Sequence, residues 1–143
     1  MRILRSLSVI LVLALAATVA FANQTSDEVP IIPPTLYQEG YWYTTPVQAN
    51  VYVPPAATIY HISWTLAYLP NNTLPSGIVV WLCDQSSNCT QLSTLFSTGS
   101  TDYFDGELAD QTFKLYFEIP GSGSINPAYY GSNVSQVILD FQY

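Results

Sequence analysis

"IYHISWTLAY", residues 59–68, has a clear alternation of side chains that indicates the fold class of this chain. Its side chains alternate: one side has Tyr60, Ile62, Trp64, Leu66 and Tyr68, and the other has Ile59, His61, Ser63, Thr65 and Ala67. A β-strand repeats every two residues, so this pattern predicts a strand that buries one face in a core and turns the other toward solvent.

Short runs of the same kind occur along the rest of the chain, with turn-forming residues between them. Loops are expected at 69–77 and 120–124, which contain prolines and glycines. Eleven Tyr, three Trp and six Phe favour strands. We therefore predict an all-β fold, an antiparallel β-sandwich or a partly closed barrel of about seven short strands. Besides 59–68, strands are expected near 40–45 and at 47–53, 78–83, 90–96, 112–119 and 135–143; the apolar run 78–83 suggests a strand covered on both faces.

The first 22 residues have the pattern of a cleaved signal peptide. Arg2 and Arg5 precede an apolar run over residues 7–22, and Ala20 and Ala22 form the small-x-small site that signal peptidase requires. The run has 16 residues, fewer than the roughly 20 that span a bilayer as a helix, which disfavours the alternative of an uncleaved anchor. We predict cleavage before Asn23, export of the remaining chain and no stable membrane insertion afterwards.

Two further segments are expected after the signal peptide. Residues 23–38 contain Pro30, Pro33 and Pro34, which interfere with regular pairing, so this part is predicted to be a Pro-rich linker or N-terminal arm. Residues 39–143 are expected to form the β-sandwich domain. A chain of this length can bury a core of its own.

The charge balance excludes one class of partner. Lys114 is the only Lys or Arg after residue 22, and ten acidic residues minus one lysine give a net charge of −9 for residues 23–143. A surface so poor in cations cannot neutralise phosphates, so nucleic acid is excluded as a partner and anionic membrane surfaces are disfavoured.

The two cysteines, Cys83 and Cys89, are predicted to form a disulfide. Five small or polar residues, "DQSSN" (84–88), separate them and read as the loop of a hairpin, so the cysteines face each other on paired strands. A structural zinc site needs four ligands, and the chain has only two cysteines and one histidine. A redox pair needs the Cys-x-x-Cys spacing, whereas five residues separate these two cysteines. An exported chain with an even number of cysteines favours the bridge.

Three aromatic residues at the start of the domain, Tyr41, Trp42 and Tyr43, are the candidate binding residues. Exposed Tyr and Trp side chains supply contact area for sugars and peptides. The alternative is that they belong to the core and its rim, as we expect for Trp64 and Trp81.

The titratable residues point less clearly to chemistry. His61, the only histidine, is expected on the solvated face of its strand. The acids Asp102, Asp105, Glu107 and Asp110 read as a solvated loop; calcium binding or an acid/base pair is the alternative, although the spacing matches no calcium motif. We assign no catalytic residue, no metal ligand and no cofactor.

The chain from residue 40 onward also resembles the family of the flagellar protein FlhE, in the order and spacing of several short motifs. These are "GYW" (40–42), "ISW" (62–64), "GIVVWLC" (77–83), the cysteine hairpin "LCDQSSNC" (82–89), "GSTDYF" (99–104), "FEIPGSGSINPA" (117–128) and "SQVILDFQY" (135–143). The last two are the closest match. The chain is more acidic and poorer in cations than the family pattern, and a reversed surface field would bind different surfaces.

The resemblance implies a periplasmic, non-enzymatic β-sandwich that serves the bacterial flagellum. The family is associated with swarming and with keeping the flagellar export gate from leaking protons, and a chaperone-like role has been suggested. A protein partner in the export apparatus or basal body is therefore expected. Two other hypotheses stay open: a small carbohydrate- or peptide-binding module that uses Tyr41, Trp42 and Tyr43, and a hydrolase that uses the acids of residues 102–110.

Overall fold

The computed structural model describes residues 22–143, and every helix or strand in that range is a β-strand. The prediction of an all-β antiparallel fold is confirmed, with eleven strands rather than about seven and with open sheets rather than a closed barrel. Residues 22–143 contain no helix able to cross a membrane. The predicted signal peptide lies outside the described residues, except for Ala22. The strands are β1 (Gln24–Pro30), β2 (Leu36–Gln38), β3 (Tyr43–Val47), β4 (Thr58–Thr65), β5 (Tyr68–Leu69), β6 (Val79–Cys83), β7 (Cys89–Gln91), β8 (Thr98–Thr101), β9 (Phe113–Glu118), β10 (Ser124–Gly131) and β11 (Gln136–Gln142).

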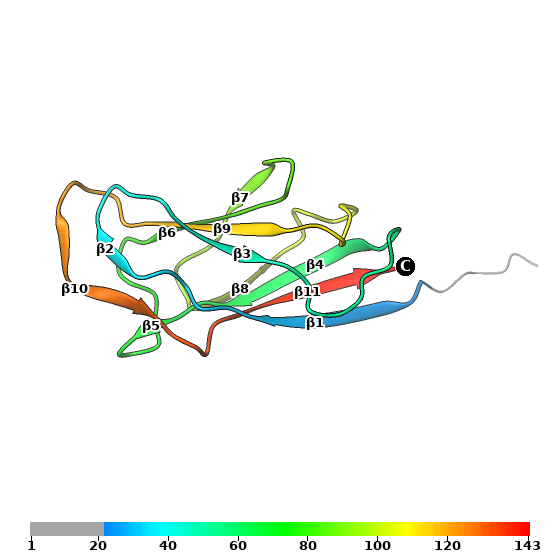
Figure 1. Cartoon of the computed structure of the whole chain (residues 1–143), viewed down its shortest axis with the longest axis horizontal. Coiled ribbons are helices and arrows are strands. Elements are labelled where there is room, and N and C mark those ends of the chain that lie inside the picture. The colour runs from blue at the N-terminus through cyan, green and yellow to red at the C-terminus, as the bar shows by residue number, and fades with distance from the viewer. Residues whose placement is uncertain (1–21) are drawn as a thin grey trace, which may run out of the picture.

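The strands form two main layers and a smaller sheet at one end. One layer has the strand order β1-β11-β4-β8 and the other β3-β9-β6-β7. The third sheet, β2-β10-β5, lies at the left end of the molecule in Figure 1. Each main sheet alternates buried and more exposed residues along its strands, as expected for two sheets packed face to face.

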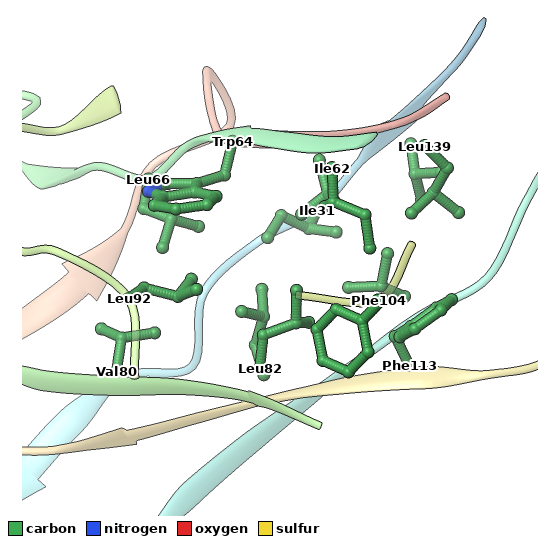
Figure 2. Packing of buried hydrophobic residues seen from close by; sticks show 14 of the residues in the cluster. Ile31, Ile62, Trp64, Leu66, Val80, Leu82, Leu92, Phe104, Phe113 and Leu139 are labelled. Atoms are coloured by element: carbon green, nitrogen blue, oxygen red, sulfur yellow. The ribbon is translucent and has the colours of Figure 1, made fainter. Parts of the chain in front are cut away.

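The core lies between the two main layers. In β9, Phe113, Leu115 and Phe117 are buried, while Lys114 between them is exposed. Figure 2 shows side chains of β4, such as Ile62 and Trp64, facing side chains of β6 across this interior. The 59–68 stretch therefore takes the role that its alternation predicts.

One position in that stretch departs from the prediction. Tyr60 is only half-buried, and its neighbour Ile59 is buried instead. The cause is a register shift between β4 and β11: Asp140 pairs with His61 and Phe141 pairs with Ile59, so Tyr60 is an extra residue without a partner. A bulge of this kind exchanges the two faces of a strand at one point.

Because of their prolines, residues 23–38 were expected to be a linker or N-terminal arm, but they contain two strands. Gln24–Pro30 pairs along its whole length with β11, and Leu36–Gln38 forms β2. Pro30 is tolerated because β1 is at the edge of its sheet, where a missing N–H costs no ladder hydrogen bond. The carboxylate of Asp27 also accepts a hydrogen bond from the backbone N–H of Asn50, at 2.5 Å.

Other strand boundaries differ from the expectations as well. The strand expected near 40–45 lies at Tyr43–Val47. The strand expected at 47–53 does not form: the next strand begins at Thr58, and Val51 and Tyr52 are exposed in the loop between them. Strands β8 and β10 were not predicted. The expected turn at 120–124 is present up to Gly123, and the backbone N–H groups of Ser122 and Gly123 donate to the Glu39 carboxylate at 3.2 and 3.1 Å.

The buried hydroxyl of Tyr68 leads to a testable prediction about stability. Its hydroxyl is buried without a hydrogen-bond partner among residues 22–143, and burial raises the pKa of Tyr68 above its ordinary value of 10.0. We expect Tyr68→Phe to leave the free energy of unfolding unchanged or to raise it by up to about 1 kcal/mol, because an unsatisfied group is removed.

The same shift predicts a pH dependence. Above pH 10 the unfolded chain loses the Tyr68 proton and the folded chain keeps it, so stability falls as pH rises, by up to about 1.4 kcal/mol per pH unit from this group. Urea unfolding at pH 7 and above pH 10 measures both effects. An equal alkaline loss in Tyr68→Phe would contradict the assignment.

Candidate functional site

The cysteine hairpin forms as predicted. Cys83 ends β6, Cys89 begins β7, and the two residues pair directly and are joined by a disulfide with a Cα–Cα distance of 4.1 Å. The Asp84 carboxylate closes the loop by accepting hydrogen bonds from the backbone N–H and the side-chain amide of Asn88, at 2.8 and 2.7 Å. The bridge therefore holds β7 to the sheet at the point where its short ladder begins.

Reduction should loosen this hairpin without unfolding the protein. Closing so short a loop contributes about 2 kcal/mol through chain entropy, so we expect that loss in the free energy of unfolding after reduction. Chemical denaturation with and without reductant measures it, and intact mass should rise by two hydrogens. An unchanged mass would show that no disulfide is present, and complete unfolding on reduction would show that the fold depends on the disulfide.

A groove of about 750 Å³ lies on the outer face of the same sheet, beside the disulfide. Its apolar wall consists of Trp42, Trp81 and Tyr116, and Lys114 and the Cys83–Cys89 bridge continue it. The strand register explains why these groups meet: Trp81 pairs with Tyr116, and Cys83 pairs with Lys114. The residues between them, such as Leu82 and Leu115, point into the core.

Lys114 is the one cationic group of the groove. Its side chain is exposed, and within residues 22–143 no carboxylate lies within 4.0 Å of its ammonium group; the one side-chain ion pair found there is His61 with Asp102. Asp84 lines the same groove, but its carboxylate is held by Asn88. The arrangement is an aromatic surface with one cation that has no ion-pair partner among residues 22–143.

The structure separates the three predicted binding residues. Trp42 lines the groove with 49% of its surface exposed. Tyr41 is exposed but does not line it. Tyr43 packs against the core and lies edge-to-face on Tyr37, with ring centroids 5.3 Å apart. Whether any of the three binds a ligand stays a prediction.

Sequence reasoning missed Trp81, Tyr116 and Lys114 as members of one site. Trp81 was expected in the interior, and its strand was expected to be covered on both faces, but Val79 and Trp81 are only half-buried. Lys114 and Tyr116 lie on β9, more than thirty residues further along the chain. The alternation of β9 was the available signal, because it places these two residues together on the outward face.

The titratable residues lie elsewhere. His61 Nδ1 is 2.5 Å from Asp102 Oδ1, on the other main sheet, so His61 is half-exposed as expected but has an acidic partner that the sequence did not reveal. Asp105, Glu107 and Asp110 are exposed. No group of three or more potential metal ligands occurs within the part of the chain that the structure describes.

Comparisons with known proteins agree with the fold. The sequence model of the family described as Flagellar protein FlhE matches residues 33–142. A solved structure titled "Crystal Structure of FLHE" is 25% identical, with a TM-score of 0.72, and the match covers 85% of this chain and 100% of that one. No curated protein matches. The family match covers most of the chain, and so this protein belongs to the flagellar protein FlhE family.

Proposed function

We propose that this FlhE-family protein works in the periplasm as a non-enzymatic accessory of the flagellum, supporting flagellar export or assembly and swarming. The observation that carries the proposal is the family match over residues 33–142. Its partner would be a protein component of the export apparatus or basal body.

The disulfide supports the location. Bridges such as Cys83–Cys89 persist in oxidising compartments and are rare in the cytosol, where thiols are kept reduced. An exported protein would meet those conditions in the periplasm.

The start of the fold also suits the predicted cleavage site. Asn23 and Tyr143 exchange two backbone hydrogen bonds, at 2.9 and 3.0 Å, immediately before β1 begins at Gln24. Cleavage before Asn23 would leave this pair and the whole β1–β11 ladder intact.

A binding role suits the site better than catalysis does. The groove offers aromatic rings, a disulfide and an ammonium group, whereas the acid–base pair His61–Asp102 lies on the other sheet. General acid–base catalysis requires the base within hydrogen-bond reach of the reacting group. The groove would therefore act by holding a partner.

The test is deletion of the gene followed by complementation. We expect deletion to reduce swarm expansion, the full-length chain to restore it, and a chain lacking residues 1–22 to fail although it is expressed. Maleimide labelling with and without reductant should find Cys83 and Cys89 bridged only in the exported form. Normal swarming after deletion, or rescue by the leaderless chain, would overturn the proposal.

A further inference from the structure

We propose that the groove is the partner-docking surface and that it takes an apolar segment of a polypeptide that places a single carboxylate on Lys114. The choice of a polypeptide rests on the function proposed above. The shape and charge of the groove argue for the rest.

The outer faces of the two main sheets differ in chemistry. On β4, the outward positions His61, Ser63 and Thr65 are polar, and Tyr60 at the bulge is the one aromatic side chain beside them that is not buried. On the groove side, Trp81 and Tyr116 occupy paired outward positions, and Trp42 adds a third ring. Trp and Tyr dominate the binding energy of protein interfaces because they bury large area at little conformational cost. Their concentration on one sheet face marks that face for contact.

The charge of the chain defines the occupant further. Residues 23–143 carry ten acidic side chains and one lysine, a net charge of −9. A polyanion would be repelled by this field, whereas one carboxylate can reach the Lys114 ammonium group, which has no ion-pair partner in the described part of the chain. The complementary ligand therefore carries an isolated negative charge in apolar surroundings.

The groove is also held ready for binding. Lys114 and Tyr116 lie on β9, which is paired on both sides, and the Cys83–Cys89 bridge ties the hairpin beside them. A surface that needs little ordering loses less free energy when it binds. An extended peptide lying across β9 would meet the rings and the ammonium group together.

A carbohydrate is the rival occupant. A neutral sugar could stack on Trp42 and Trp81 but would make no use of the charge on Lys114. The two occupants are separated by asking whether binding depends on a carboxylate.

The three tryptophans provide the assay. In ¹H–¹⁵N spectra of the mature chain, the indole N–H signals of Trp42 and Trp81 report on the groove, and the buried Trp64 is an internal control. The probes are the peptide acetyl-Phe-Leu-Phe with a free C-terminal carboxylate, the same peptide as its C-terminal amide, and chitotriose.

We expect the carboxylate peptide to shift the Trp42 and Trp81 signals and to saturate at millimolar concentration, with Trp64 unmoved. Lys114→Met keeps an unbranched side chain that is one atom shorter and removes its charge. It should weaken binding of the carboxylate peptide about tenfold without affecting binding of the amide. Tyr52→Ala, at an exposed site outside the groove, is the matched control and should bind as the native chain does.

Three results would overturn the proposal: no shift with either peptide at millimolar concentration, equal binding of carboxylate and amide, or binding of chitotriose alone. None of them would affect the swarming test of the proposed function. The failure of the docking surface and the failure of the flagellar role can therefore be told apart.

Discussion

Phe117→Ala is expected to lower the free energy of unfolding by about 4 kcal/mol. The Phe117 ring is fully buried in the core between the two sheets and lies edge-to-face on Tyr68, with centroids 6.3 Å apart. Truncation removes this apolar surface from the core and leaves a cavity that the two rigid sheets can close only in part. Urea denaturation followed by circular dichroism measures the loss.

Phe96→Ala is the matched control for that experiment, because the same side chain is there 73% exposed in the loop before β8. We expect it to change stability by no more than about 0.5 kcal/mol. Equal effects of the two substitutions would contradict the placement of the core.

Gly131→Ala is expected to destabilise the protein by about 3 kcal/mol. A Cβ atom at this position would lie 1.9 Å from the backbone oxygen of Pro33 and 2.7 Å from its carbonyl carbon. The contact is with backbone, so no side-chain rotation relieves it, and the segment that joins β1 to β2 would have to move off β10.

Gly77→Ala separates this clash from the effect of backbone conformation. Gly77 has a φ of +77° but would place its Cβ in open space, so only the cost of a left-handed residue applies, about 1 kcal/mol. Thermal unfolding of both variants tests the difference. If Gly131→Ala were as stable as the native chain, the packing of residues 31–35 on β10 would be wrong.

Phe117 and Gly131 illustrate what the sequence could and could not predict about the fold. The alternation of residues 113–119 was enough to place Phe117 in a core, because a strand repeats every two residues and the pattern is local. The contact between Gly131 and Pro33 joins positions almost a hundred residues apart, and no local pattern reveals it. Pairing between distant segments also explains why part of the expected Pro-rich linker is an edge strand: Gln24–Pro30 pairs with β11 near the end of the chain.

The residues of the groove could not be predicted together for the same reason, because they are distant in the sequence. The cysteine pairing followed from a short loop between two local strand patterns. Trp42, Trp81 and Lys114 come from three strand regions whose order in the sheet is not the order in the sequence. Burial statistics assigned Trp81 to the interior, because they cannot tell which face of a strand remains open.

Swarm expansion by the deletion strain carrying a Trp42→Ala/Lys114→Met double variant tests most directly whether the flagellar role depends on the groove. Lys114 is exposed and Trp42 is 49% exposed, so the variant should be produced and should unfold close to the temperature of the native chain. We predict that it fails to restore swarming, while Tyr52→Ala restores it at the same cellular level of the protein. Full restoration by the double variant would contradict the account.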